Sequence, residues 1–316
     1  MITVDNLGKT YGATAAIQNI TFQVEAGEIL GFLGPNGAGK TTTMRILAGY
    51  LPATTGTAKI AGFDVHTEGM KVRQNIGYLP ENPPLYLDMS VEGYLHFVAH
   101  IKGIPRSDRS SKVNIALEKC QLTHKKKVII RKLSKGYKQR VGIAQAIVHD
   151  PPVIILDEPT IGLDPRQIIE VRNLIKSLAG THTIILCSHI LPEVRMVCDR
   201  ITIVNKGKVV ATNTPTKLMA ELRGSLGYEI EIDGNPAQIQ PLLEVIPGVS
   251  LVEIKHKNED NPHNHSFLYV TCDSDSEPGR DIAMVIINVG MGLYEMRRVN
   301  PSLEDVFLEL TTEETI

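Results

Sequence analysis

The sequence has 316 residues and a formal net charge of −2, and its 42% hydrophobic and 22% charged residues exclude a disordered chain. This length favours one large and one small domain with a sizeable core. The apolar runs are too short to cross a bilayer and the first residues lack a signal-peptide pattern, so we expect neither a membrane span nor secretion. We expect the cysteine thiols to be free.

Apolar strands alternate with helices along most of the chain. In chain order we expect short strands within Ile2–Val24, a strand over Gly27–Leu33, a helix over Lys40–Ala48, a strand over Ile76–Leu79, a mainly helical region at about residues 88–150, a strand over Val153–Leu156, a helix over Pro165–Leu178 and a strand over Thr183–Cys187. This alternation implies an α/β fold with parallel strands covered on both faces. Ligands collect at the carboxyl ends of such strands, where the polar motifs of this chain lie.

The chain becomes acidic in its last third. From Gly224 onward there are 5 Lys and Arg against 17 Asp and Glu, whereas the preceding part has 28 against 18. This change indicates a domain boundary, and we assign domains to residues 1–222 and 228–316. The second domain is predicted as strand Tyr228–Ile232, helix Pro236–Val245, strands Ser250–Lys255 and Phe267–Thr271, helix Gly279–Val289, strand Leu293–Arg298 and a short helix Ser302–Glu309.

That order of elements resembles a small α+β ferredoxin-like unit. The second domain contains no ligand motif, so a dimerising or stabilising accessory domain is favoured over a sensor of small molecules.

A glycine-rich loop follows the strand over Gly27–Leu33 and satisfies the pattern GxxxxGK[ST]. Gly37 and Gly39 let the backbone turn its amides toward one point, and the next helix adds free N–H groups and a positive dipole end. Lys40 can reach the β- and γ-phosphates and the Thr41 hydroxyl can ligate Mg²⁺. The residues expected to bind nucleotide here are Gly34, Pro35, Asn36, Gly37, Ala38, Gly39, Lys40, Thr41 and Thr42. A glycine-rich turn without a ligand is the alternative; the strand–loop–helix context favours a P-loop NTPase.

The apolar strand over Val153–Leu156 ends in two carboxylates, Asp157 and Glu158. Asp157 is placed to hold the hydration shell of the metal, directly or through water. Glu158 can polarise the water that attacks the γ-phosphate. Acidic residues at a strand end are common by themselves, but downstream of a P-loop they favour a site for hydrolysis of ATP with Mg²⁺.

The segment Leu133–Arg140, LSKGYKQR, opens a helix with Ser134 at the N-cap position. It resembles the LSGGQ-type signature that defines ABC ATPases. A serine hydroxyl and the Gly136 amide at a helix N-terminus make a second phosphate site, and the P-loop already encloses the phosphates from its own side. The resemblance therefore implies two copies placed head to tail, each completing the site of the other. An N-cap serine without a further role is the alternative.

Further motifs of the ABC family follow in order. Asp164, in Gly162-Leu-Asp-Pro165, matches the D-loop at the dimer seam, and His189 matches the switch histidine that contacts the γ-phosphate. With Lys40 and Glu158, His189 completes the expected catalytic set. Tyr11 looks like the aromatic residue that stacks on adenine, with a packing role as its rival.

The chain departs from the family pattern at Glu81, where the family usually has Gln beside the nucleotide. A carboxylate can ligate Mg²⁺ or orient water, so Glu81 is expected to contact nucleotide and to join Thr41 and Asp157 as a metal ligand. In the signature, Lys135 and Tyr137 replace Gly and Gln, while Ser134 and Gly136 remain.

The resemblance covers residues 1–222 and implies a P-loop NTPase ABC cassette, with a RecA-like core, an antiparallel β subdomain and a helical subdomain. It implies the ATPase subunit of an ABC transporter, most similar to ABC-2-type exporters of the gliding-motility-type subgroup, with ATP and Mg²⁺ as cofactors. The implied partners are a second ABC subunit, here a homodimer, and a membrane permease contacted at Pro80–Tyr86. We expect no nucleic-acid partner and a peripheral location on the cytoplasmic face of the membrane.

Two other functions compete with transport. Ribosome-acting ABC ATPases carry two cassettes in one chain, and DNA-repair members separate the P-loop from the signature by a long coiled coil. This chain has one cassette and about ninety residues between Lys40 and Ser134, without sustained heptads. An ATP-binding regulator that hydrolyses poorly is disfavoured by the complete set of Lys40, Asp157, Glu158 and His189.

Overall fold

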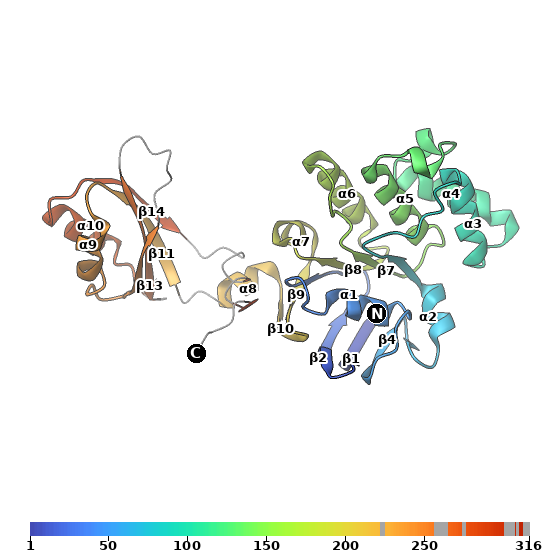
Figure 1. Ribbon diagram of the computed structural model, residues 1–316, viewed down its shortest axis with the longest axis horizontal. Helices are drawn as coiled ribbons and strands as arrows, with labels where there is room; N and C mark the ends of the chain where they lie inside the picture. Colours follow the sequence, from blue (N-terminus) through green and yellow to red (C-terminus); the bar gives the residue numbers. More distant parts are fainter. Residues whose placement is uncertain (222–224, 256–264, 274–275, 300–306, 308–309, 312–316) are drawn as a thin grey trace. The chain divides into compact units, whose positions relative to one another are not determined.

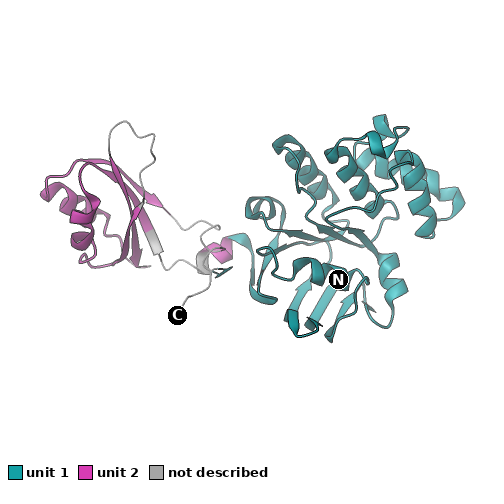
Figure 2. Ribbon diagram, viewed as in Figure 1, with its two compact units in different colours: residues 1–215, 310–316 teal, residues 216–309 magenta. Residues whose placement is uncertain are grey.

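The computed structural model describes the chain except for residues 222–224, 256–264, 274–275, 300–306, 308–309 and 312–316 (Figure 1). The chain divides into two compact units, one formed by Met1–Pro215 with Leu310–Ile316 and the other by Thr216–Glu309 (Figure 2). In the first unit, the side-chain amide of Asn205 donates hydrogen bonds to the carbonyl oxygens of Leu310 at 3.4 Å and Thr311 at 3.2 Å. The chain therefore leaves the first unit and returns to it.

A six-stranded sheet forms the centre of the first unit, in the order β10-β9-β3-β8-β7-β6. Its strands are β3 (Ile29–Leu33), β6 (Ile76–Leu79), β7 (Val153–Asp157), β8 (Thr183–Ser188), β9 (Arg200–Asn205) and β10 (Lys208–Asn213). All neighbours pair in parallel except β10, which is antiparallel to β9. Every residue of β3, β7 and β8 is buried, because helices cover both faces, so these strands are continuously apolar over most of their length.

The helices of this sheet lie on opposite faces, with α1 (Lys40–Leu47) on one and α6 (Pro165–Leu178) and α7 (Leu191–Val197) on the other (Figure 1). α1 also contacts a second, antiparallel sheet in the order β2-β1-β4-β5. The strands of that sheet are β1 (Ile2–Tyr11), β2 (Thr14–Val24), β4 (Thr55–Ile60) and β5 (Phe63–Asp64). One hydrophobic core joins both sheets, with the rings of Phe22 and Phe32 5.4 Å apart. The predicted α/β core and antiparallel sheet are confirmed.

The region between β6 and β7 is helical, as predicted for residues 88–150. It contains α3 (Val91–Ile101), α4 (Arg106–Lys119), α5 (Lys135–Ile147) and the 3₁₀ turns η1 (Thr123–Lys125) and η2 (Ile130–Lys132). α3, α4 and α5 pack on one another, and α5 also contacts β6 and β7 of the central sheet. Serines cap two of these helices: Ser90 accepts from the Gly93 N–H at 3.1 Å and Ser134 from the Tyr137 N–H at 3.5 Å. α2 (Gly69–Asn75) precedes β6.

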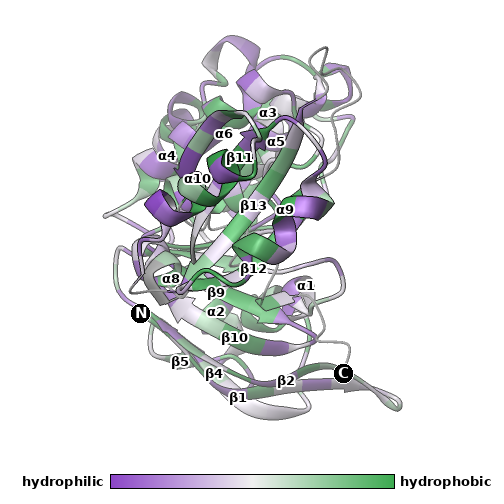
Figure 3. Ribbon diagram, turned by 90° about the vertical axis from the view of Figure 1, so that its left-hand side faces the viewer, coloured by the Kyte–Doolittle hydropathy of each residue, from purple (hydrophilic) through white to green (hydrophobic). Residues whose placement is uncertain are grey.

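The second unit has a four-stranded antiparallel sheet in the order β12-β13-β11-β14. Its elements are α8 (Pro215–Glu221), which begins at the boundary, then β11 (Ser225–Ile232), α9 (Pro236–Leu243), β12 (Val249–Lys255), β13 (Ser266–Asp273), α10 (Gly279–Asn288) and β14 (Leu293–Val299). Every second residue of β13 is buried in a hydrophobic core that belongs to this unit alone. The strand is mostly hydrophobic, whereas α9 also carries hydrophilic residues (Figure 3). The predicted order of strands and helices is confirmed, while the predicted helix Ser302–Glu309 lies outside the described residues apart from Phe307.

The predicted strands end one residue early. β7 extends to Asp157 and β8 to Ser188, so both strands deliver polar side chains at their carboxyl ends. All four cysteines are buried and free, as expected. Within the part of the chain that the structure describes, we find no helix that combines the length and the apolar character needed to span a membrane.

Candidate functional site

The loop between β3 and α1 carries two glycines with left-handed backbone, Gly37 with φ +82° and Gly39 with φ +96°. Other residues are strained in this conformation, and a Cβ on Gly39 would also lie 2.5 Å from Cγ2 of Ile17 and 2.7 Å from the carbonyl oxygen of Ala16. α1 begins directly afterwards at Lys40, so the loop leads into the free N–H groups of a helix N-terminus. The predicted P-loop geometry is therefore present.

Lys40 is buried at the start of α1, with 6% of its surface exposed. Its ammonium group donates to the carbonyl oxygens of Gly34 at 2.8 Å and Pro35 at 3.2 Å, and it lies 3.8 Å from Oε1 of Glu158. The ammonium thus sits between the loop and the carboxylate, where an anion bound by the loop would meet a positive charge.

Asp157 is fully buried at the end of β7, and neither of its carboxylate oxygens has a hydrogen-bond partner among the described residues. Burial raises the pKa of this carboxyl group because it disfavours the charged form. A buried carboxylate without a partner is costly, and a cation would compensate it. The Thr41 hydroxyl at the start of α1 and the Glu81 carboxylate are oxygen ligands of the kind Mg²⁺ takes, so the residues present fit this ion.

Glu158 has the left-handed backbone angle φ +51°, which is rare outside glycine and costs about 1–3 kcal/mol. Its N–H donates to the carbonyl oxygen of Cys187 at 2.9 Å, which ties the strained residue to β8. Its Oε2 lies 2.9 Å from Nδ1 of His189. The strained backbone therefore aims the carboxylate at the lysine and the histidine instead of along the strand.

Lys40, Glu158 and His189 line one pocket of about 540 Å³ at the carboxyl ends of the strands. Its lining residues are Ala16, Asn36, Gly37, Gly39, Lys40, Thr41, Thr42, Glu81, Glu158, Ile161 and His189. Tyr11 is not part of this lining; it is 51% exposed at the end of β1, with the Lys9 ammonium 5.3 Å from its ring centre. Its exposure argues against the packing role that rivalled adenine stacking.

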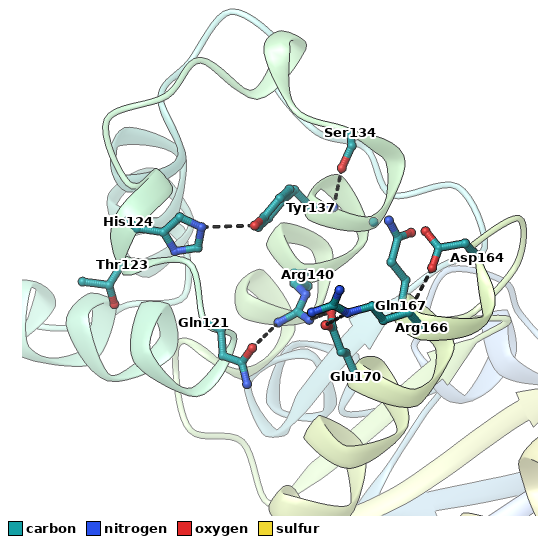
Figure 4. A pocket seen from close by; sticks show the side chains of 11 residues that line it. Gln121, Thr123, His124, Ser134, Tyr137, Arg140, Asp164, Arg166, Gln167 and Glu170 are labelled. Atoms are coloured by element: carbon teal, nitrogen blue, oxygen red, sulfur yellow. Dashed lines mark hydrogen bonds and ion pairs between the residues drawn. The ribbon is translucent and has the colours of Figure 1, made fainter.

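The signature residues line a second pocket of about 730 Å³ (Figure 4), which shares no lining residue with the first. Ser134 caps α5, and Asp164 caps α6 by accepting from the Gln167 N–H at 2.9 Å. The lining residues of this pocket are Gln121, Thr123, His124, Ser134, Gly136, Tyr137, Arg140, Asp164, Arg166, Gln167 and Glu170. The structure thus divides most of the predicted site residues between two pockets of one chain. The predicted residues that line neither pocket are Tyr11, Gly34, Pro35, Ala38 and Asp157.

Sequence reasoning missed the polar network inside the second pocket. Arg140 donates to Oε1 of Gln121 at 3.0 Å and to Oε2 of Glu170 at 2.5 Å, and Nε2 of His124 lies 3.1 Å from the hydroxyl of Tyr137 (Figure 4). These contacts join segments that lie up to 30 residues apart in the chain, so motif spacing gave no signal for them.

The loop between β3 and α1, together with Asp157 and Glu158 at the end of β7 in the same sheet, defines a P-loop NTPase. A family model described as ABC transporter matches residues 17–161. The linearmycin resistance ATP-binding protein LnrL of Bacillus subtilis is 30% identical over 98% of both chains, and the bacitracin transport ATP-binding protein BcrA of Bacillus licheniformis is 33% identical over 100% of this chain and 99% of its own. The chain belongs to the family of ABC transporter ATP-binding proteins.

The solved structures agree with this assignment. The dimeric structure of MJ0796, a bacterial ABC transporter cassette, matches with a TM-score of 0.62 and 25% identity over 68% of this chain and 98% of its own. The predicted ABC cassette is confirmed, and the chain is the ATP-binding subunit of an ABC transporter, an ATPase.

Proposed function

We propose that this chain hydrolyses ATP with Mg²⁺ as a homodimer and thereby powers export by a separate ABC-2-type permease. The observation that carries the proposal is the pocket that joins Lys40, Glu158 and His189. The chain also matches a linearmycin resistance and a bacitracin transport ATP-binding protein over 98% and 100% of its length. The finer resemblance to gliding-motility-type subunits supports export without specifying the cargo.

Within the first pocket, we assign phosphate binding to the backbone of residues 34–39 and to Lys40, Thr41 and Thr42. Glu158 is the general base that takes a proton from the attacking water, and His189, 2.9 Å from Glu158, contacts the γ-phosphate. Tyr11 stacks on adenine with its exposed ring.

We assign the metal ligands to Thr41, Asp157 and Glu81, with Asp157 acting directly or through water. When bound, Mg²⁺ neutralises the charge that develops on the phosphates. Glu81 lines the pocket, and burial, followed by the negative charges of Glu158 and Glu81, raises the pKa of Asp157. A cation held by both carboxylates would offset this repulsion.

Glu81→Gln is expected to weaken metal binding roughly tenfold, because a neutral amide oxygen replaces a charged ligand. The measurement is a titration of Mn²⁺ by electron paramagnetic resonance with a non-hydrolysable ATP analogue present, accompanied by the Mg²⁺ dependence of hydrolysis. Glu92→Gln on α3 is the matched control, since it removes the same charge outside the pocket. Equal Mn²⁺ affinity in the wild type and Glu81→Gln would contradict the assignment.

The second pocket supports a shared active site. Ser134 and Gly136 lie at the N-terminus of α5 in a pocket separate from Lys40, so within one chain they do not meet the nucleotide held by the P-loop. We infer that they contact the γ-phosphate of the nucleotide bound by a second copy, with Asp164 at the seam between the copies. The dimeric state of the similar cassette MJ0796 supports this arrangement.

A groove at the edge of the central sheet suits the permease. It has a volume of about 380 Å³ and lies beside β6, the strand that leads into Pro80–Tyr86. Tyr50, Met70 and Ile101 along it are exposed by 70%, 67% and 66%. We infer that the permease inserts an apolar segment here and also contacts Pro80–Tyr86. The chain would then lie peripherally on the cytoplasmic face of the membrane.

Ile101→Asp is expected to reduce co-purification of the membrane partner roughly tenfold or more, because a charge would be desolvated in the interface. Affinity for ATP should stay unchanged. Ile115→Asp on α4 is the control, since Ile115 is 44% exposed but does not line the groove. Recovery of Ile101→Asp with the membrane protein at wild-type levels contradicts the docking site, and recovery of the wild type only with ribosomes contradicts transport.

We further propose that residues 1–222 are the nucleotide-binding domain and that residues 228–316 form a ferredoxin-like accessory domain. The antiparallel order β12-β13-β11-β14, with α9 and α10 contributing to one core, supports this architecture. We assign it a stabilising or dimerising role.

A further inference from the structure

A second carboxylate lies behind Glu158, on a helix that the proposed mechanism does not use. Glu193, in α7, is 7% exposed. Its Oε2 accepts a hydrogen bond from the hydroxyl of Thr160 at 2.5 Å, and its Oε1 is buried without a hydrogen-bond partner among the described residues. No described cation forms an ion pair with it, in contrast to Glu158, which lies beside Lys40 and His189. A buried, unpaired carboxylate is costly, so its position calls for an explanation beyond stability.

The hydroxyl of Ser188 connects the two carboxylates. Its Oγ lies 3.5 Å from Oε2 of Glu158 and 3.5 Å from Oε2 of Glu193. Oγ itself is fixed, because it accepts from the N–H of Ile190 at 3.0 Å and Ser188 is fully buried at the end of β8. Because this hydroxyl contacts both carboxylates and is held by the Ile190 N–H, it couples the position of one carboxylate to that of the other.

A hydroxyl has one hydrogen and can donate to only one of two carboxylates at a time. Both contacts are hydrogen bonds only if one carboxyl group keeps its proton. Burial raises the pKa of Glu193, and the neighbouring charge of Glu158 raises it further, whereas the hydrogen bonds from Thr160 and Ser188 and the charge of His189 act in the opposite direction. A protonated Glu193 can donate to Ser188 while Ser188 donates to Glu158.

We propose that Glu193 is a positioning residue for Glu158, acting through Ser188. Thr160, whose hydroxyl donates to Glu193, lies in the segment that leads to Asp164. Glu193 therefore connects the orientation of Glu158 to the segment assigned to the dimer seam. This inference rests on the proposed role of Glu158 as the general base.

The test compares Glu193→Ala with Glu193→Gln in the full-length chain. Glu193→Ala is expected to lower kcat about 10- to 100-fold while KM and the affinity for a fluorescent ATP analogue change less than about twofold, because a misplaced base slows chemistry without weakening binding. Glu193→Gln should keep kcat within about threefold, since its amide can accept from Thr160 and donate to Ser188. Ser188→Ala is expected to lower kcat as much as Glu193→Ala does, and the double variant should be no slower than either single variant.

Val194→Ala is the matched control for packing. Val194 is the next residue of α7 and is fully buried against Gly31 of β3, and its aliphatic side chain cannot hydrogen-bond, so its truncation should lower Tm and leave kcat unchanged. A Glu193→Ala variant with wild-type kcat, or one whose only change is a higher KM, overturns the proposal. So does a Glu193→Gln variant that is as slow as Glu193→Ala.

A double-mutant cycle separates this inference from the proposed function. In the Glu158→Gln background, Glu193→Ala should slow the remaining hydrolysis no further, because its effect passes through Glu158. If the losses in kcat of the two single variants multiply in the double variant, the positioning role is wrong while Glu158 remains the base. If Glu158→Gln itself hydrolyses ATP at the wild-type rate, the proposed function fails first.

Discussion

The Glu158→Gln variant is expected to lose about 10²- to 10⁴-fold in kcat while it binds ATP as tightly as the wild type. Glutamine preserves the shape of the side chain but cannot take the proton of the attacking water. ATP therefore stays intact between the two copies, and the dimer that it closes is retained. The measurements are phosphate release under excess ATP and size-exclusion chromatography with ATP and Mg²⁺, where the variant elutes as a dimer and the wild type returns to monomer.

Glu118→Gln provides the control, because Glu118 lies on the exposed side of α4 and the substitution removes the same charge. This control is expected to behave as the wild type in both measurements. Hydrolysis by Glu158→Gln at the wild-type rate would show that another group is the base.

Mixing two inactive variants is expected to restore activity if the active site is shared between copies. Lys40→Ala removes the phosphate-binding ammonium, and Ser134→Asp keeps the N-cap of α5 but places a negative charge against the phosphate of the partner. Each variant alone is inactive. A mixed dimer carries both changes in one site and an intact second site, so hydrolysis should return to roughly a quarter of the wild-type rate when about half of the dimers are mixed at random.

The control for this experiment mixes Lys40→Ala with Glu158→Gln. Both residues line the same pocket of the same chain, so each site of that mixed dimer carries one defect and no activity returns. If the first mixture stays as inactive as the second, each chain completes its own site and the head-to-tail arrangement is wrong.

The central sheet and its motifs could be predicted from the sequence because they depend on local patterns. The residues of β3, β7 and β8 are buried on both faces, so these strands appear as apolar runs of five or six residues. Gly37 and Gly39 indicate a turn that strains other residues, and the carboxyl ends of parallel strands gather at one edge. Lys40 and Glu158 could therefore be placed together although 117 positions separate them.

The contacts around the motifs could not be predicted, because they depend on how helices pack. Glu193 lies in a short helix with no motif, and only the packing of α7 beside β8 brings it to Ser188 and Thr160. Arg140 belongs to the signature, but its partner Glu170 comes from the middle of α6. Such pairs carry no spacing signal, since the intervening loops differ in length. The ends of β7 and β8 were also missed by one residue, because a strand end is set by its neighbours in the sheet.

The left-handed backbone of Glu158 has a consequence for engineering this protein. Asparagine and glycine adopt φ near +51° with less strain, so either relieves backbone strain at this position and also removes the carboxylate that pairs with Lys40 and His189. A directed-evolution screen that rewards heat resistance alone does not depend on catalysis, so it does not select against inactive cassettes at residue 158. Thermostable variants of this family need selection for turnover at every round.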